Sequence, residues 1–371
     1  MRIGTVKKLY WLSTFGQIAV TETVWRYHRG ETVRPFSLRS ALSARGCSRP
    51  MQRVLVDFGA DEAFAGAAVK VQEHYGVEVA ASRVREICLR QAHALAAQPL
   101  QRVRTLGSRG PAAIVVETDG TMIPVVRFDA NGAGVDLRKH RQVCWQEMRL
   151  CAAQAQGETS THYAATFGAP AEVGVRWTQV ARQAGWAANS FIHGVGDGAE
   201  WIAQQFRQQF GAHGQYTLDL YHVCEYLAPA APEPTQAASF AADTREALRR
   251  NESVEVIAGL AARLESPDLP DEQAPVRRAH RYLHNRSDQL DYKSALAREL
   301  PIGSGLIESG NRHVLQARLK IPGAWWKPEN AHAMAQLRVC RANNKWKQLW
   351  INYNHPSLPI APRPDPFGRP A

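Results

Sequence analysis

Three acidic residues of this chain are spaced so that one fold could bring them to a common site. Asp119 and Asp197 each follow an apolar run and precede a glycine, and Glu308 follows Gly303-Ser304-Gly305. Each also has a structural alternative, because Asp-Gly is typical of a turn and an acid early in a helix complements the helix dipole. Carboxylates that converge repel one another unless cations neutralise them, and hard divalent ions such as Mg²⁺ or Mn²⁺ prefer oxygen ligands.

Two such ions can activate a water or a 3′ hydroxyl on one side of a phosphodiester and stabilise the leaving oxygen on the other. The charge of the chain favours a polyanionic partner, since 45 Lys and Arg stand against 34 Asp and Glu, a formal net charge of +11. Charge alone suits DNA, RNA or a membrane surface equally. The excess is concentrated in residues 1–110 and 301–350. Basic ends and clustered acids together predict phosphoryl transfer on nucleic acid.

The composition excludes several other classes of protein. A content of 45% hydrophobic and 21% charged residues is typical of a packed globular chain and not of a disordered one. The sequence contains neither an apolar run of membrane-spanning length nor a signal-peptide pattern, so we expect a cytoplasmic protein with no membrane partner. Six well-separated cysteines without a C-x-x-C pair argue against a zinc ribbon or a disulfide framework.

Residues 1–110 are expected to form a mostly helical region with one small β element. Apolar stretches from 13 to 26, broken at Gly16, predict a hairpin, and residues 61–97 predict two helices separated at Gly76. The second helix is expected to start near Ser82 and to carry Arg83, Arg85 and Arg90. A DNA-reading helix-turn-helix fits this pattern, and so does an ordinary pair of packed helices.

Residues 111–222 predict an α/β unit with a mixed sheet, antiparallel in one half and parallel in the other. Strands are expected at 113–117 and 122–126 around a tight turn at Thr118-Asp119-Gly120, and the expected order is β-β-β-α-β-α-β. Further strands are expected near 148–152, 162–166, 191–195 and 216–218, and helices near 171–184 and 200–209. Carboxylates follow three of the strands, where ligand sites of open α/β sheets gather.

The remaining residues divide into three parts. Residues 223–300 predict an all-helical insertion, and 301–350 predict the C-terminal part of the catalytic core, with helices near 306–316 and 328–343. The tail within 351–371 is rich in proline and is expected to be extended or disordered.

Four strings occur in order between residues 14 and 347. They are Asp119-Gly120-Thr121-Met122-Ile123-Pro124, Gly196-Asp197-Gly198-Ala199-Glu200-Trp201-Ile202, Asp219-Leu220-Tyr221-His222, and Gly303 to Glu308 continuing through Asn311, Arg312, Arg318, Leu319 and Lys320 to Trp325-Trp326. With these strings the chain resembles bacterial insertion-sequence transposases of the ISKra type, which are Mutator-like members of the DDE group. The resemblance implies an RNase H-like mixed-sheet core that is interrupted by a helical insertion and preceded by a mostly helical DNA-binding region.

The resemblance also implies roles for individual residues. Asp119, Asp197 and Glu308 match the three catalytic acids, which hold two Mg²⁺ or Mn²⁺ ions. Asp219 and His222 match the C/D-x-x-H motif that follows the second acid. A rival assignment makes Asp219 the second metal acid, and a local hydrogen bond at a helix N-terminus is the structural alternative.

The segment after Glu308 is basic and aromatic. Its polar residues could share a helix face and bind phosphates flanking the scissile bond, or they could form a solvated face; they are Asn311, Arg312, Arg318 and Lys320. Trp325 and Trp326 could stack on unpaired bases or anchor a core. Residues 223–300 contain no tryptophan. Because relatives that make flanking hairpins place an aromatic there to hold a flipped base, the resemblance puts a hairpin route in doubt.

The expected function is therefore that of a bacterial DNA transposase, cytoplasmic and nucleoid-associated. It binds the terminal inverted repeats of its element and target DNA, most simply as a homodimer because two ends must be processed. Two alternatives remain, namely an RNase H-like nuclease or resolvase without strand transfer, and a truncated or domesticated DNA-binding protein. Family members often carry more sequence before the region matching Phe15-Gly16, so this chain is either a short member or a truncated one.

Overall fold

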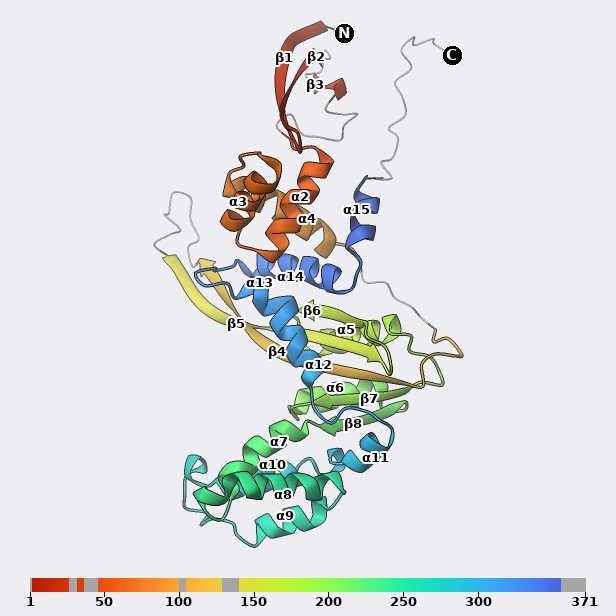
Figure 1. The fold of residues 1–371 in the computed structure, drawn as a ribbon, viewed down its shortest axis with the longest axis vertical. Coiled ribbons are helices and arrows are strands. Elements are labelled where there is room, and N and C mark those ends of the chain that lie inside the picture. The colour runs from red at the N-terminus through yellow and green to blue at the C-terminus, as the bar shows by residue number, and fades with distance from the viewer. Residues whose placement is uncertain (1, 27–31, 37–45, 100–104, 129–139, 355–371) are drawn as a thin grey trace. The chain divides into compact units, whose positions relative to one another are not determined.

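The computed structural model describes residues 2–26, 32–36, 46–99, 105–128 and 140–354 (Figure 1). The chain divides into two compact units, one of residues 1–91 with 344–371 and one of residues 92–343. None of the helices in the described part of the chain is long and apolar enough to cross a membrane. The proline-rich tail expected from residue 355 lies outside the described residues.

The first unit contains a small antiparallel sheet and helices. The sheet has the order β1-β2-β3, with β1 (Arg2–Ser13), β2 (Gly16–Arg26) and β3 (Thr32–Val33). The helices are α2 (Arg49–Asp61), α3 (Phe64–Tyr75), α4 (Ala81–Ala96), whose last residues belong to the second unit, and α15 (Trp346–Asn354). A hairpin is present, but not within residues 13–26 as expected: it pairs β1 with β2, so residues 13–26 supply the turn and only the second strand.

The predicted helix pair of the first unit is confirmed. Its break lies at Gly76, which adopts a left-handed conformation that glycine tolerates without strain. The second helix begins at Ala81, slightly before the expected Ser82. Sequence reasoning missed α2, although its capping signal is present: the Ser48 side chain accepts the Met51 N–H, and Pro50 lies in the first turn.

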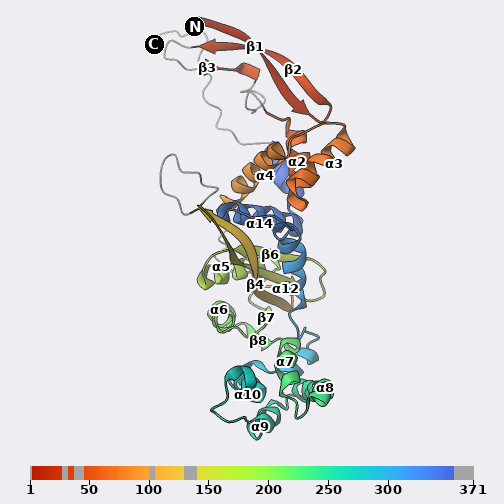
Figure 2. The ribbon, with the colours of Figure 1, turned by 90° about the vertical axis from the view of Figure 1, so that its left-hand side faces the viewer.

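The second unit is built on a five-stranded mixed sheet with the order β6-β5-β4-β7-β8 (Figures 1 and 2). The strands are β4 (Ala113–Phe128), β5 (Arg141–Ala155), β6 (Thr161–Thr166), β7 (Phe191–Gly196) and β8 (Gly214–Leu218). The pairs among β6, β5 and β4 are antiparallel, and those among β4, β7 and β8 are parallel. With α5 (Pro170–Gln183) and α6 (Glu200–Phe210), the observed order is β-β-β-α-β-α-β as expected, although the two strands expected at 113–117 and 122–126 form the single strand β4.

The expected tight turn at Thr118-Asp119-Gly120 is wrong. β4 continues through these residues, because β5 pairs with it without interruption from Ile114 to Phe128. On its other edge β4 pairs with β7 only as far as Glu117. Asp119 therefore lies inside a strand, just beyond the parallel part of the sheet, and not in a hairpin turn.

The two faces of β4 contact different helices. Ile114 and Val116 point into a core with α5 and α6, whereas Ala113 and Val115 pack with Ala295 and Leu300. This alternation follows from the two-residue period of a strand. It places Glu117 and Asp119, which follow Val115 at the same period, on the face opposite α5 and α6.

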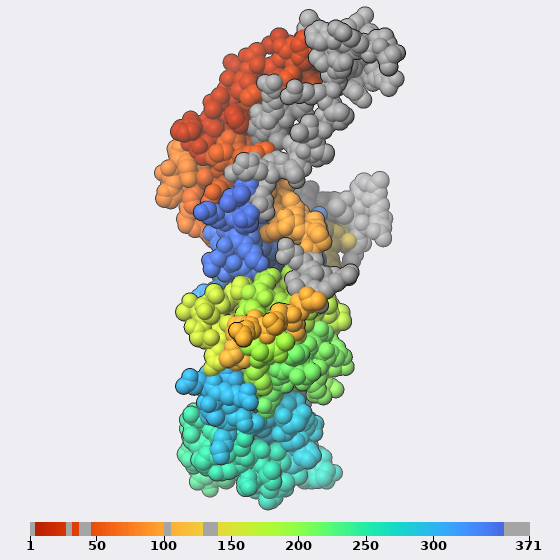
Figure 3. All heavy atoms as spheres, turned by 90° about the vertical axis from the view of Figure 1, so that its right-hand side faces the viewer, coloured from red at the N-terminus to blue at the C-terminus, as the bar shows by residue number. Residues whose placement is uncertain are grey.

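The residues between 220 and 300 are helical, with their own hydrophobic core. Their helices are α7 (Leu220–Leu227), α8 (Ala237–Arg249), α9 (Ser253–Ala261), α10 (Pro275–His284) and α11 (Tyr292–Ala297), with short 3₁₀ turns at Ala228–Ala230, Pro234–Gln236, Asp271–Gln273 and Ser287–Gln289. Figure 3 shows this part of the second unit, in teal, packed closely on the rest of that unit.

The second unit ends with helices that return to β4. α12 (Gly305–Gly310) continues into a π-helical turn (Asn311–Gln316) and α13 (Ala317–Leu319), and α14 (Pro328–Ala342) follows. The two expected helices near 306–316 and 328–343 are thus confirmed. The π-helical geometry of the first was not predicted.

Candidate active site

Two of the predicted acids lie side by side just past the stretch in which β4 and β7 pair in parallel, Asp119 inside β4 and Asp197 directly after β7. β4 and β7 are paired in register through Glu117 and Val195. Asp119 lies two residues after Glu117, and Asp197 lies two residues after Val195. Because neighbouring strands lie only about 4.8 Å apart, the two backbones meet at this edge of the sheet.

A third aspartate continues the same row. β7 and β8 are paired through Gly196 and Leu218, so the next residues are Asp197 and Asp219. The Asp219 N–H donates to the Gly196 carbonyl at 2.8 Å, which extends the ladder past the strand end. The structure thus confirms that Asp197 and Asp219 follow strand ends, as the sequence predicted.

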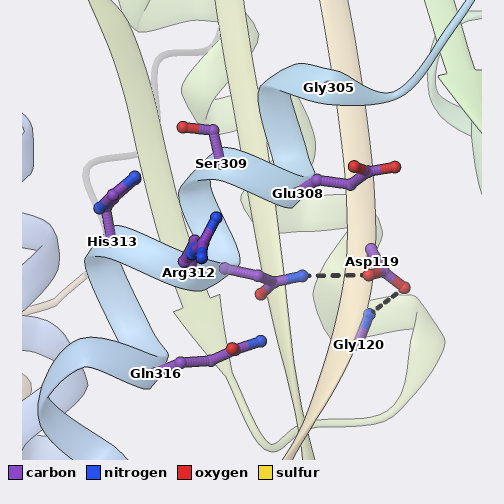
Figure 4. A pocket seen from close by; sticks show the side chains of 9 residues that line it. Asp119, Gly120, Gly305, Glu308, Ser309, Arg312, His313 and Gln316 are labelled. Carbon is purple, nitrogen blue, oxygen red and sulfur yellow. Dashed lines mark hydrogen bonds between the residues drawn. The ribbon is translucent and has the colours of Figure 1, made fainter.

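Both carboxylate oxygens of Asp119 accept hydrogen bonds. The Gly120 N–H donates to Oδ1 at 2.6 Å, and the Asn311 side-chain amide donates to Oδ2 at 3.0 Å (Figure 4). Burial raises the pKa of Asp119, and the negative charges of Asp197 and Glu147 raise it further against the effect of these two donors. The surroundings of Asp119 therefore disfavour its ionised form relative to a carboxyl group in water.

Asp197 is more loosely held. Its Oδ1 accepts the Ala199 N–H at 2.8 Å, at the start of α6. Among the described residues, no donor lies within hydrogen-bond distance of its Oδ2. The Asp197 carbonyl accepts the Tyr282 hydroxyl at 2.6 Å, so helix α10 of the insertion fixes the backbone that presents this acid.

Asp219 differs from Asp197 because its carboxylate is fully engaged. Oδ1 accepts the N–H groups of Tyr221 and His222 at 2.7 and 3.2 Å, which caps α7. Oδ2 accepts the N–H of Ser304 at 2.8 Å and also its hydroxyl. Only 2% of Asp219 is exposed. With four donors, this buried carboxylate joins the start of α7 to the start of α12.

His222 contributes only its backbone to that arrangement. Its Nδ1 lies 3.3 Å from a carboxylate oxygen of Glu225, and its ring contacts the rings of Tyr226 and Tyr282. The Asp219 and His222 pair of the C/D-x-x-H motif is therefore a helix cap in this structure.

Glu308 approaches Asp119 from the first turns of α12. The two carboxylates line a common pocket of about 490 Å³, and Figure 4 shows both at its acidic end. The other lining residues are Gly120, Gly305, Ser309, Asn311, Arg312, His313 and Gln316. Arg312 and His313 are exposed, so the pocket has carboxylates on one side and basic and polar groups on the other.

A fifth acid, Glu117, belongs to this cluster and was missed by sequence reasoning. It is almost fully buried, and its Oε2 accepts the Ile307 N–H of α12 at 2.7 Å. Burial, reinforced by the charges of Asp219 and Glu308, raises the pKa of Glu117 to about 8. A signal was available in the sequence, because Glu117 interrupts an apolar strand two residues before Asp119 and so shares its face.

The donor set of the cluster suits hard cations, since every acid offers carboxylate oxygens. Within the described residues, however, no group of three or more His, Cys, Asp or Glu side chains is gathered closely enough to hold one metal ion. The carboxylates instead stand in neighbouring positions, Asp119 beside Asp197 on the sheet and Glu308 on the facing helix. Such positions suit ions that retain water and take further oxygens from a substrate.

The chain matches the profile of a protein family described as Uncharacterised protein family (UPF0236) over residues 41–350. It belongs to the UPF0236 family. The matched span contains all five acids, Glu117, Asp119, Asp197, Asp219 and Glu308, and the helices α2 to α4. No curated protein matched the chain.

In this UPF0236 member, the polar residues after Glu308 do not share one exposed face as expected. Asn311 is buried and bonded to Asp119, and Arg312 is exposed at the pocket. Arg318 is 2% exposed, with its guanidinium 4.9 Å from the ring centre of Trp326. Lys320 is partly exposed. The π-helical turn between 311 and 316 changes the angular spacing on which the expectation relied.

The two adjacent tryptophans have different environments. Trp326 is buried, its indole N–H donates to the Leu319 carbonyl at 3.1 Å, and its backbone pairs with Pro124 and Val126 on the free edge of β4. Trp326 is thus an anchor of the core, which was one of the two interpretations of its sequence. Trp325 remains 41% exposed.

The arginines predicted to contact DNA lie on α4, within the first unit. Glu86 pairs with Arg83 at 3.0 Å and with Arg90 at 2.6 Å. Arg85 is exposed. Two of the three predicted DNA-contacting cations are therefore partly neutralised within their own helix.

Proposed function

We propose that this UPF0236 protein is a metal-dependent DNA transposase with an RNase H-like catalytic core. The observation that carries the proposal is the adjacency of Asp119 and Asp197 just past the parallel-paired stretch of β4 and β7, with Glu308 beside Asp119 at the acidic end of one pocket. The mixed sheet, antiparallel in one half and parallel in the other, supports the fold that the motifs imply. The basic character of the chain supports DNA as the substrate.

Asp119, Asp197 and Glu308 would hold Mg²⁺ or Mn²⁺, and their oxygens fit such ions in kind. When bound, the ions supply activation of a water or a 3′ hydroxyl and stabilisation of the leaving oxygen. The raised pKa of Asp119 supports a cation at this point, because an uncompensated cluster of carboxylates is unfavourable.

The residues of the chain would divide the remaining tasks. Asn311 and the Gly120 N–H hold the Asp119 carboxylate in one orientation. Arg312, exposed on the other side of the pocket, is placed to bind a phosphate beside the scissile bond. Helices α3 and α4 would recognise the terminal inverted repeats, and a homodimer would process two ends.

The structure favours Asp197 over Asp219 as the second metal acid. Asp197 has one oxygen available, whereas four donors already occupy the two oxygens of Asp219. Exposing or redirecting the Asp219 carboxylate would break the cap of α7 and its bond to Ser304.

A pair of matched substitutions tests the assignment. Asp197→Asn should abolish cleavage and transfer of pre-cut ends, at least 10³-fold, while duplex binding and the free energy of unfolding stay near those of the unsubstituted chain. Asp219→Asn should instead lower the free energy of unfolding by about 1–3 kcal/mol, because buried donors lose their charged acceptor. Gel assays of strand transfer and urea titrations measure the two effects.

Other outcomes of the same assays identify other functions. Cleavage without insertion of pre-cut ends into target DNA would indicate a nuclease or resolvase. Binding without any divalent-dependent cleavage would indicate a DNA-binding protein. Full activity of Asp197→Asn would transfer the role to Asp219.

A further inference from the structure

Two tryptophans from distant parts of the sequence form an exposed pair on the β4–β5 ribbon. Trp145 is 56% exposed and Trp325 is 41% exposed. Their ring centres lie 6.3 Å apart with an angle of 63° between the planes. Met122 and Val143 are also exposed large apolar side chains of this ribbon. We call these four residues the tryptophan platform.

The strand register shows that the platform lies on the face of β4 opposite the acids. Trp145 of β5 stands directly across from Pro124 of β4, and Val143 across from Val126. On β4, the partner residues Pro124 and Val126 have even numbers, as Met122 does, whereas Asp119 has an odd number. Because side chains alternate between faces along a strand, the platform is a separate surface from the pocket.

Trp325 is held in place by its neighbour. The Trp326 N–H donates to the Pro124 carbonyl at 3.2 Å, and the Val126 N–H donates to the Trp326 carbonyl at 2.7 Å. This bridge fastens the backbone next to Trp325 to the edge of β4. The backbone that carries Trp325 is therefore fixed on the sheet before a ligand binds.

Basic side chains border the platform. Lys327 is exposed, with its ammonium group 5.7 Å from the ring centre of Phe128. Arg141 is exposed and stands directly across from Phe128, hence on the platform face. Glu147, which stands directly across from Met122, is an acid on the same face, and it forms an ion pair with Arg149. The border therefore has an excess of positive charge.

We infer that the tryptophan platform binds the unpaired bases of a single DNA strand. Exposed indole faces stack on any base, and cations beside them bind the intervening phosphates. An aromatic surface with a cationic border fits this ligand better than an apolar protein surface. The inference rests on the proposed function for its choice of DNA, and it assigns Trp145 and Arg141, which no motif singled out.

The test compares two single-stranded oligonucleotides of equal length, one ordinary and one built of abasic sites, which offer the same phosphates without bases. Binding to the full chain is measured by fluorescence anisotropy. The unsubstituted chain should prefer the ordinary strand, and Trp145→Leu and Trp325→Leu should each reduce that preference about tenfold. Trp145→Phe, which keeps an aromatic face, should retain most of it.

The controls separate stacking from other effects. Trp145→Leu and Trp145→Phe both replace an exposed indole, so a general loss of folding would affect both, and urea midpoints show whether either is unstable. Equal binding of the two strands by the unsubstituted chain would overturn the inference. A Trp145→Leu protein that keeps its preference for bases would also overturn it. If that protein in addition changes from dimer to monomer, the platform is a contact between two copies of the chain.

The outcome is distinguishable from failure of the proposed function. Loss of the base preference alongside unchanged divalent-dependent cleavage of duplex ends supports the platform on an active enzyme. A chain that never cleaves DNA but shows the base preference contradicts the transposase proposal and leaves the platform in place.

Discussion

At the scale of single residues, the orientation of one carboxylate depends on one buried amide. The Asn311 Nδ2 group donates to Asp119, while its Oδ1 is buried without a hydrogen-bond partner among the described residues. An unpaired buried acceptor is unfavourable, so the fold accepts a cost at this position. Asn311 is also the first residue of the π-helical turn, a feature often found at functional sites. We therefore interpret Asn311 as a positioning residue for Asp119.

Replacing this amide should change the pH dependence of cleavage. A hydrogen bond to the charged form lowers the pKa of a carboxyl group, so Asn311→Ala should raise the pKa of Asp119 further. The acidic limb of the pH profile for kcat should move to higher pH, and kcat at neutral pH should fall about tenfold or more. Single-turnover cleavage measured across the pH range tests this.

A matched control lies one π-helical turn further along. Gln316→Ala removes the amide that donates to the Thr121 hydroxyl at 3.0 Å, a bond of the same kind to a residue that does not titrate. It should alter the free energy of unfolding by about 1 kcal/mol without moving the pH profile. If Asn311→Ala leaves the pH profile of kcat unchanged and lowers the free energy of unfolding as much as Gln316→Ala does, Asn311 contributes only to packing.

At the scale of elements, the sequence predicts the short strands and helices well. It predicts the long strand β4 poorly. The strands and helices between Thr161 and Leu218 follow from apolar periodicity, because each is short and ends at polar or glycine residues. β4 does not, since Thr118-Asp119-Gly120 has the composition of a turn and only the long pairing with β5 keeps it extended. That pairing is a tertiary effect, which local propensity cannot encode.

The candidate site shows the same division. Asp119, Asp197 and Glu308 could be selected from their spacing, and strand register then explains why the first two are neighbours. The contrast between Asp197 and Asp219 could not be derived, because it depends on the Ser304 donors, which approach from 85 residues further along the chain. The burial of Arg318 likewise depends on a π-helical turn with no recognised sequence pattern.

A buried histidine should report on the connection between β7 and the segment before α12. The His193 Nε2 group donates to the Pro301 carbonyl at 2.7 Å. Burial, with a smaller contribution from the charge of Arg298, lowers the pKa of His193 below its usual 6.5. Protonation therefore favours the unfolded chain, so the stability it contributes is complete above pH 6.5 and is lost as the pH falls below that value.

Substitution of this histidine separates its charge from its hydrogen bond. His193→Gln, which keeps a donor but does not titrate, should show a smaller fall in urea midpoint between pH 7.5 and pH 5 than the unsubstituted chain. His193→Phe should lose about 1–3 kcal/mol at both pH values, because the buried Pro301 carbonyl is left without its donor. Equal pH dependence in all three proteins would show that other groups control acid stability.

At the scale of the whole molecule, the net positive charge and the clustered acids belong to different sets of residues. The net charge of +11 is spread over residues of both compact units, whereas the clustered acids lie within residues 92–343. Tyr282 of the insertion also bonds to the Asp197 backbone, so the insertion supports the site although it supplies none of the proposed metal acids. Binding and cleavage should accordingly respond to different solution conditions.

Binding of duplex ends should weaken steeply with salt, because phosphate contacts release counterions; six contacts correspond to about a 10³-fold loss between 50 and 200 mM. Arg85→Ala should reduce the slope of log affinity against log salt by about 1, and Arg90→Ala by less, because Glu86 already pairs with Arg90.

Excess chelator should abolish cleavage and leave binding unchanged. Cleavage that persists in chelator would contradict this separation, since the acids would then act without the cations that their mutual repulsion requires.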